Sequence, residues 1–398
     1  MIQPIARRAE LDALCVNLKQ RLAADPRLLI DTEFIRERTY EPVLEIVQVG
    51  TADGTIALLD VPALGGLGAI GEILTDPTIL KVLHAGGQDV EILTMLLGQM
   101  PGPIFDTQVA AAFAGYGSQT GYGALVQAVL GVRLSKEEGF ADWSRRPLTP
   151  AMCAYAADDV RYLPELHDKL VARLEQRRRL ARATEQMTRQ LTTASETTPP
   201  EELWRKVGSK QGLGRRELAV LRELAIWRDE EARRRNKPRR TVLKDEPLVE
   251  IAKRKPKTAE ALLELRAVHG VGTRQAEELI QAIQHALTLP ESQWPVIESL
   301  PPLDEQGGAL LELLSAVVKV RAMEEDLPPS LLAPSDELRA LAIHRRKLDH
   351  EGALFSGWRG EILGKALRSS LAGTLSVAWD PKRGRLVCHH EDNPTAAL

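Results

Sequence analysis

The 398-residue sequence lacks long apolar runs, and it has few aromatic residues and only three cysteines. No window approaches the roughly 18 uninterrupted apolar residues of a membrane-spanning helix, so no membrane association is expected. The segment MIQPIARRAELDAL turns acidic and helical where a secretion signal would place its apolar stretch. A cytoplasmic location is therefore expected.

Cysteine is too scarce for a structural framework. Cys15, Cys153 and Cys388 stand alone, with no close pair that would hold zinc and no spacing typical of disulfides. Aromatic residues make up 4% of the chain, which argues against extended base stacking on its surface. The 44% hydrophobic and 27% charged residues predict a globular protein, and the length suggests two or three domains.

Net charge is also nearly absent, at −3, but the two signs are unevenly distributed. Residues 204–290 contain 20 Lys and Arg against 12 Asp and Glu, whereas residues 1–182 contain 19 against 23. A basic segment inside an acidic chain favours a polyanion such as a nucleic acid as partner. Its densest run consists of Arg233, Arg234, Arg235, Lys237, Arg239 and Arg240. Such a run alone is equally compatible with a solvated helix end and with phosphate contact.

The N-terminal part alternates between strand and helix patterns. Apolar runs of strand length occupy residues 28–30, 46–49, 55–59 and 79–84. Asp53-Gly54 is a hairpin signal between the second and third runs, and helical spacing follows at 88–98. Three early strands followed by alternating elements predict an α/β fold, a mixed sheet with helices on its faces.

Two further helices are expected in this part. One begins near Ile104-Phe105 and is capped by either Asp106 or Thr107. The other is a long helix from Thr149-Pro150 onward. Its inward face is predicted to comprise Cys153, Ala157, Val160, Leu163 and Leu166.

Composition divides the rest of the chain. The polar stretch TTASETTPP and the proline-rich LPESQWPVIESLPP read as linkers on either side of the basic segment. The blocks after each of them are helical and of similar size, which suggests a diverged duplication. The expected divisions are a domain over 1–190, a linker over 191–203, a helical bundle over 204–290, a linker over 291–302, a second helical bundle over 303–374, and a tail over 375–398 that forms a hairpin.

Acidic residues interrupt the apolar elements at three places. Asp31 and Glu33 are two apart at the end of a buried strand, so their side chains face the same side. Asp89 stands in the first turn of a helix, where capping alone would explain it. Tyr155 and Asp159 are four apart and therefore share a helical face. Asp158, next to them, is either solvated or paired with Arg161.

Together these positions indicate more than each does alone. Four carboxylates with no nearby set of Cys or His suit a hard cation such as Mg²⁺ or Mn²⁺ rather than zinc. Without a cation, two carboxylates at the end of one strand would repel each other. Two such ions about 4 Å apart can activate a water and stabilise the leaving oxygen in phosphodiester cleavage.

The segments DTEF…TYEPVLEIVQ, HAGGQD and YAADDVRYL resemble the three motifs of the ribonuclease D family, in the DEDD superfamily of 3′→5′ exonucleases. Tyr155, four residues before Asp159, is typical of its tyrosine branch, and the resemblance extends over essentially the whole chain. The resemblance implies a ribonuclease-H-like fold and stepwise 3′→5′ hydrolysis of RNA to nucleoside 5′-monophosphates. Precursors of transfer RNA are the implied substrate, and a monomer is the implied state.

The same resemblance implies roles for the site residues. Asp31, Glu33, Asp89 and Asp159 match the family's carboxylates, which hold two Mg²⁺ or Mn²⁺ ions. Tyr155 matches the residue that orients the attacking water. A phenol with an ordinary pKa near 10 is a poor base at neutral pH, so we expect it to position the water.

The basic segment resembles the helicase-and-ribonuclease-D C-terminal (HRDC) domain, and residues 303–372 resemble a weaker copy of it. Its core is expected to contain Leu218, Leu221, Leu224 and Trp227. Gly270 and Gly272 precede a helix, so they either present backbone N–H groups to a phosphate or form a tight turn. Phosphate contact without sequence readout is expected. A DNA exonuclease and a non-catalytic RNA-binding scaffold remain the competing hypotheses.

Overall fold

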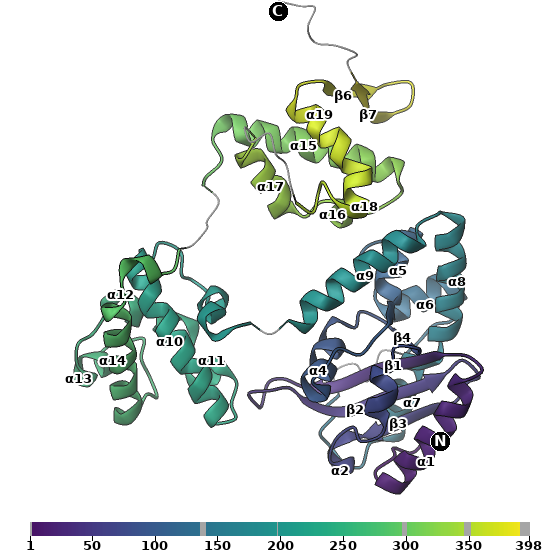
Figure 1. Ribbon diagram of the computed structural model, residues 1–398, viewed down its shortest axis with the longest axis horizontal. Coiled ribbons are helices and arrows are strands. Elements are labelled where there is room, and N and C mark those ends of the chain that lie inside the picture. Colours follow the sequence, from purple (N-terminus) through teal and green to yellow (C-terminus); the bar gives the residue numbers. More distant parts are fainter. Residues whose placement is uncertain (1, 136–140, 197, 297–300, 346–351, 391–398) are drawn as a thin grey trace, which may run out of the picture.

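The computed structural model describes residues 2–135, 141–196, 198–296, 301–345 and 352–390 (Figure 1). The end of the expected tail, 391–398, and parts of both expected linkers lie outside these residues. An α/β part comes first, followed by two helical bundles (Figure 1). Among the described helices, none combines the length and the apolar character that a membrane span needs.

A five-stranded mixed sheet forms the centre of the first part. Its strands are β1 (Arg27–Ile35), β2 (Val43–Thr51), β3 (Ile56–Asp60), β4 (Leu80–Leu83) and β5 (Ile104–Asp106). They lie in the order β3-β2-β1-β4-β5, with β1, β2 and β3 antiparallel and β4 and β5 parallel to β1. Gly54, with φ of +91°, forms the turn between β2 and β3. The predicted mixed sheet and hairpin are confirmed.

The sheet is covered by helices on both faces. The helices are α1 (Arg8–Leu22), α2 (Val61–Leu64), α3 (Ile70–Thr75), α4 (Gly87–Leu97), α5 (Thr107–Ala114), α6 (Tyr122–Leu130), α7 (Pro150–Arg161), α8 (Leu163–Gln176) and α9 (Leu180–Ser195). Val47 and Val49 of β2 pack with α1, whereas Ile46 of the same strand packs with α7. Because side chains alternate along a strand, α1 and α7 lie on opposite faces.

Two expectations about local structure are refined. Strand β1 continues to Ile35, so Asp31 and Glu33 lie within the strand rather than at its end. Asp106 is the cap of α5, because its carboxylate accepts hydrogen bonds from the backbone N–H groups of Gln108 and Val109. This settles the choice between Asp106 and Thr107.

The expected long helix from Thr149 is wrong as a single element. It is divided into α7 and α8 at Tyr162, because Pro164 stands in the first turn of α8. Proline lacks an N–H donor and disfavours helical geometry in the residue before it, so a new helix begins there. The predicted inward face is nevertheless buried throughout: Cys153, Ala157, Val160, Leu163 and Leu166.

The first helical bundle has a core of its own. It comprises η1 (Pro200–Lys206), α10 (Arg215–Arg234), α11 (Arg239–Val242), α12 (Asp245–Arg254), α13 (Ala259–Leu263), α14 (Thr273–Thr288) and η2 (Glu291–Gln293). The four residues predicted for its core are buried: Leu218, Leu221, Leu224 and Trp227. The polar stretch before it is narrower than expected, because α9 extends to Ser195 and Leu203 is already buried in the bundle.

The second bundle repeats the beginning of the first. It comprises α15 (Glu305–Glu324), α16 (Pro329–Leu332), α17 (Ser335–Ile343), α18 (Gly357–Arg359), a π-helical turn (Gly360–Gly364) and α19 (Lys365–Leu371). Helices α15, α16 and α17 each begin 90 residues after α10, α11 and α12, and α15 and α10 are both 20 residues long. This correspondence supports the duplication. A hairpin of β6 (Leu375–Asp380) and β7 (Arg385–His390) follows, as expected.

The two bundles contact the α/β part differently. The second bundle shares its core with the α/β part, where the Trp358 ring meets Phe113 edge-on at 4.9 Å between centroids. The first bundle keeps a separate core and is met mainly by Tyr40, in the β1–β2 loop (residues 36–42). Equivalent turns make a polar contact in each case: Asn236 accepts from the Tyr40 N–H, and Asp326, 90 residues later, pairs with Arg177.

Candidate active site

Three carboxylates meet on the face of the sheet that α7 covers. Asp31 and Glu33 lie on β1, opposite Gln48 and Ile46 of β2, and Asp159 lies on α7. One oxygen from each of the three carboxylates lies within 4.8 Å of the others. The strand alternation thus brings Asp31 and Glu33 to the same face, and the packing of α7 adds Asp159.

Asp89 reaches the site from a different element and a different direction. It lies in the first turn of α4, is buried, and accepts a hydrogen bond from the hydroxyl of Thr32. Thr32 alternates with Asp31 and Glu33 along β1, so its side chain leaves the other side of the strand. The structure therefore places Asp89 beside the group of three carboxylates and not within it.

The electrostatics of the carboxylates are unfavourable without a cation. Burial raises the pKa of Asp31 well above its usual range, and the charges of Asp89, Asp159 and Glu33 add to this. Burial likewise raises the pKa of Glu33 to about 8 and that of Asp159 to about 7. Carboxylates held together out of water stay ionised only where a positive charge compensates them. A divalent cation fits this donor set, which consists of oxygen alone.

Tyr155 lies one helical turn before Asp159 on α7, and its ring packs with Trp143 at 6.2 Å between centroids. Burial raises the pKa of the Tyr155 phenol, and the charges of Asp159, Glu33 and Asp31 act in the same direction. The hydroxyl therefore stays protonated at neutral pH. It can hold a water by a hydrogen bond but cannot remove its proton.

Two polar residues near the carboxylates, Gln48 and His84, were not predicted as site residues from the sequence. Gln48 donates from Nε2 to Asp31 at 3.4 Å, and among the described residues its Oε1 has no hydrogen-bond partner although it is buried. His84 binds Thr107 through Nδ1 at 2.9 Å, while its buried Nε2 has no partner in the described part of the chain. The signal for Gln48 was a polar residue within the apolar run 46–49, and His84 stands in HAGGQD.

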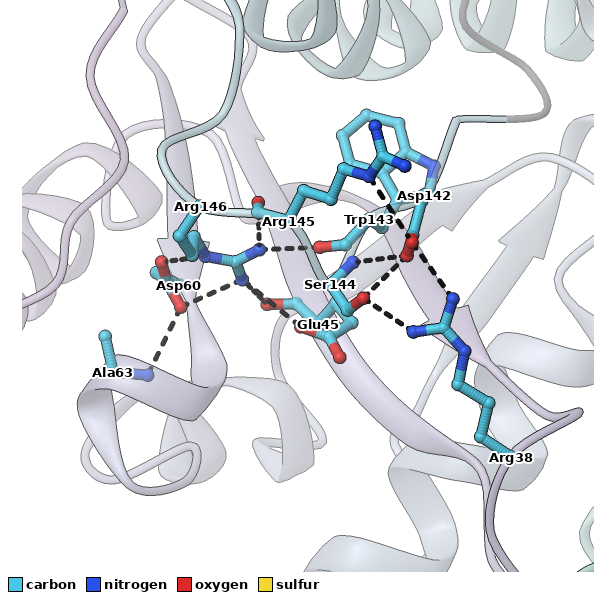
Figure 2. Close-up of polar contacts among 9 residues, drawn as sticks. All are labelled: Arg38, Glu45, Asp60, Ala63, Asp142, Trp143, Ser144, Arg145 and Arg146. Atoms are coloured by element: carbon cyan, nitrogen blue, oxygen red, sulfur yellow. Dashed lines mark hydrogen bonds and ion pairs between the residues drawn. The ribbon is translucent and has the colours of Figure 1, made fainter.

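The segment that leads into α7 is held by one arginine (Figure 2). Arg146 donates to the carboxylate of Asp60, at the end of β3, and to the carboxylate of Glu45, on β2. Its guanidinium also donates to the backbone carbonyl of Trp143. In a second, more exposed contact of this segment, the guanidinium of Arg38 donates to the carboxylate of Asp142 at 2.9 Å. Arg146 thus ties the segment before α7, the helix that carries Asp159, to β2 and β3.

Asp158, next to Asp159 on α7, pairs with Arg161 at 2.7 Å, so of the two roles left open for Asp158 the structure shows the ion pair. The cysteines are free, as expected, and Cys388 with the neighbouring histidines is not among the potential metal-binding groups of the described residues.

The basic run forms more internal ion pairs than its sequence suggested. All five of its arginines contact acidic residues of the same bundle: Arg233 and Arg239 contact Asp229, Arg234 and Arg235 contact Glu231, and Arg240 contacts Asp245. Lys237 is exposed. Gly272 caps α14 and donates to Gln275, and Gly270 has φ of +77°, so both form a tight turn. Their predicted contact with phosphate stays a prediction.

The raised carboxyl pKa values predict how the metal-free protein responds to pH. Unfolded Asp and Glu titrate near 4, so raised folded-state values contribute stability below pH 4 that is lost as pH rises through 7 and 8. We expect the midpoint of thermal unfolding in EDTA to fall between pH 5 and 8, and saturating Mg²⁺ to reverse the fall. The Mg²⁺-induced gain should reach several degrees, since each kcal/mol is about 2–4 °C for a domain of this size.

Differential scanning fluorimetry across this pH range measures the effect, with NaCl at matched ionic strength as the control. A Mg²⁺-induced gain that stays constant from pH 5 to 8 would contradict the titration of these carboxylates.

Comparison with known proteins agrees with this geometry. A family profile described as 3′-5′ exonuclease matches residues 3–175, and one described as HRDC domain matches residues 217–287. The chain is 38% identical to ribonuclease D of Granulibacter bethesdensis, with 96% of each chain covered, and 36% identical to that of Acidiphilium cryptum, over 95% of this chain and 94% of the other. A crystal structure of Escherichia coli RNase D, described as an exoribonuclease involved in structured RNA processing, superposes with a TM-score of 0.83 at 31% identity. That match covers 94% of this chain and 99% of the other.

Proposed function

Because this chain belongs to the ribonuclease D family and is a 3′→5′ exoribonuclease, we propose that it trims the 3′ ends of transfer RNA precursors with two divalent cations. The observation that carries the proposal is the group of Asp31, Glu33 and Asp159, with Tyr155 one turn away on α7. Each cycle adds one water across the terminal phosphodiester. It releases a nucleoside 5′-monophosphate and leaves a new 3′-hydroxyl on the RNA.

The carboxylates are proposed to hold the ions, with Mg²⁺ or Mn²⁺ as the cation. Asp31, Glu33 and Asp159 would bind directly, and Asp89 would complete the set from α4. When bound, the ions supply the positive charge that stabilises the negative charge developing on the phosphate oxygens and on the departing 3′-oxygen. Gln48 and Thr32 are positioning residues, because each hydrogen-bonds one of these carboxylates and limits its rotation.

Tyr155 is proposed to orient the attacking water. Its neutral hydroxyl accepts or donates one hydrogen bond, and the packing of its ring on Trp143 restricts its position. Orientation of this kind lowers the barrier because the water is held ready for attack on phosphorus before the reaction begins. The protein then has little proton transfer of its own to perform.

The first bundle is proposed to contact RNA phosphates through its excess positive charge. Lys237 and the Gly270–Gly272 turn are the candidates, together with the parts of Arg233, Arg234, Arg235, Arg239 and Arg240 that their internal ion pairs leave exposed. A monomer and a cytoplasmic location complete the proposal, and the free cysteines support a reducing compartment.

Digestion of labelled oligomers tests the proposal directly. We expect a transfer RNA with a 3′ extension to be shortened stepwise to 5′-monophosphates in Mg²⁺ or Mn²⁺, and EDTA to stop the reaction. The matched DNA oligomer is the control for sugar preference, since only RNA offers a 2′-hydroxyl. Calorimetric titration of Mg²⁺ in the presence of nucleotide should give two sites. Undiminished activity in EDTA, or equal digestion of the DNA, would contradict the proposal.

A further inference from the structure

A pocket of about 580 Å³ lies between the β1–β2 loop and the first bundle. Its walls come from both parts of the chain: residues 36–42 on one side, and η1, α10, α11 and the start of α12 on the other. Five cationic side chains line it against a single carboxylate, that of Asp245. The cationic residues are Arg36, Lys206, Arg228, Arg239 and Arg240. This excess of positive charge is typical of a site for an anion.

Arg228 is the most buried of these five cationic residues. Only 5% of the residue is exposed, and its guanidinium donates to Asp245 at 2.7 Å and to the carbonyl of Leu243 at 3.1 Å. Among the described residues, none accepts a hydrogen bond from its buried Nε. A buried donor without an acceptor costs free energy that a ligand oxygen would recover.

The charge in the pocket is only partly compensated. Asp245 is shared, because it accepts from Arg228 on one oxygen and from Arg240 and the Gly208 N–H on the other. Burial lowers the pKa of the Arg228 guanidinium, the bond to Asp245 opposes this, and the nearby Arg239 and Arg240 lower the pKa further. An anion would offset this mutual repulsion of like charges.

The pocket adjoins the carboxylates along two elements. Arg36 follows Glu33 by three residues, so their Cα atoms are at most about 11 Å apart even in a fully extended chain. The Arg36 guanidinium also pairs with Glu91 of α4 at 2.7 Å, and Glu91 is two residues beyond Asp89. The pocket is therefore within reach of a polyanion that has one end at the carboxylates.

Tyr40 fixes the loop that forms one wall. The guanidinium groups of Arg233 and Arg239 both contact its ring, with their central carbons 5.1 and 4.9 Å from the ring centroid. Its hydroxyl donates to Asp229 at 2.8 Å and accepts from both arginines. Through Tyr40 these two arginines hold the loop against the first bundle. Lys206 and Arg240 are exposed and add positive charge to the pocket, and Arg240 shares Asp245 with Arg228.

We propose that this pocket binds a backbone phosphate of the RNA substrate, upstream of the 3′ end that lies at the carboxylates. The inference rests on the proposed function, because it takes the carboxylates as the place of the 3′ end. The contact carries no base information, since phosphates are the same at every position. It sets a minimum length that an RNA must reach before the first bundle contributes to its binding.

Binding in Mg²⁺ of RNA whose 3′-terminal linkage resists hydrolysis tests the pocket while the 3′ end stays at the carboxylates. Fluorescently labelled oligoribonucleotides, from a dinucleotide to roughly a dodecamer, cover the site sizes common for single-stranded binding. Lys206→Ala and Arg240→Ala should each weaken binding of the longest RNA about tenfold. Each should also reduce the slope of log affinity against log salt by about 0.7, the value for one phosphate contact on a single strand. Binding of the dinucleotide should not change.

Lys257→Ala and Arg266→Ala are the matched controls. They remove the same charges from exposed positions of the same bundle that do not line the pocket. Losses that are equal in variants and controls, or equal at all RNA lengths, would overturn the proposal. So would variants that bind inorganic phosphate less well but RNA normally, because the pocket would then be a free-anion site. Hydrolysis of 3′-extended RNA by the unaltered chain tests the proposed function separately, and unfolding temperatures confirm that the variants fold.

Discussion

Asp31→Asn is expected to lower kcat for RNA hydrolysis by at least about a thousandfold, because it removes a charged oxygen from the centre of the proposed metal site. Metal-ion stabilisation of a phosphoryl transition state supplies several kcal/mol, and each 1.36 kcal/mol is about tenfold in rate. Asp31 lies in the group of three carboxylates, and the charges of the other site acids bear on its pKa. Stopped digestion of 3′-extended RNA, followed by product separation, measures the loss.

The same substitution is expected to stabilise the metal-free protein. Burial, and after it the repulsion by the other acids, raises the pKa of Asp31; a neutral amide avoids both costs, so the unfolding midpoint in EDTA should rise while activity disappears. Asp158→Asn is the control for the loss of a neighbouring acid, because Asp158 is adjacent to Asp159 but pairs with Arg161 and lies outside the group of three carboxylates. Activity of Asp31→Asn within tenfold of the unaltered protein, or a lower midpoint in EDTA, would contradict this role.

Arg146→Ala is expected to reduce the free energy of unfolding by about 2–3 kcal/mol. Removing one partner of a buried ion pair costs about 3–5 kcal/mol, and the partial exposure of Arg146 reduces this. The carboxylates left behind are 8% exposed on Glu45 and 8% on Asp60, so neither is well solvated. Activity should fall as well, because the segment of Figure 2 positions α7 with Tyr155 and Asp159. Urea unfolding and hydrolysis rates measure the two effects.

Arg145→Ala provides the control for Arg146→Ala. Arg145 is the next residue in the same segment, its side chain is 82% exposed, and it meets Asp142 at 3.6 Å. Exposed pairs of this kind contribute less than about 1 kcal/mol. Equal destabilisation by both substitutions would show that any side-chain truncation in this segment lowers the free energy of unfolding. The specific anchoring by Arg146 would then be wrong.

Local pattern was sufficient where one element determines its own structure. The strand runs 46–49 and 55–59, the hairpin at Gly54 and the core of the first bundle are confirmed, because period and turn chemistry depend on near neighbours. The pairing of Asp31 and Glu33 on one face also follows from strand alternation. The division at Tyr162 was missed, although Pro164 was a signal for it in the sequence.

Contacts between distant segments were not predictable in this way. Gln48 meets Asp31 only through the register of β1 with β2, and Arg146 meets Asp60 across 86 residues. The basic run was interpreted as either a solvated helix end or a phosphate contact, yet Arg233 and Arg239 both donate to the hydroxyl of Tyr40, which lies almost 200 residues earlier. Such pairs leave no periodic trace in the sequence, because each partner satisfies its own local pattern without the other.

The sequence by itself determined the chemistry of this protein: three acidic motifs at characteristic spacings, and a basic bundle hidden by a net charge of −3. Residue type and local spacing suffice for that, because charge and donor identity belong to the residues themselves. Only the tertiary structure decided how the charges are used. It gathers Asp31, Glu33 and Asp159, and it compensates much of the basic run internally while leaving positive charge around one pocket. Compensation is a matter of distance and burial, which arise only when the chain is packed.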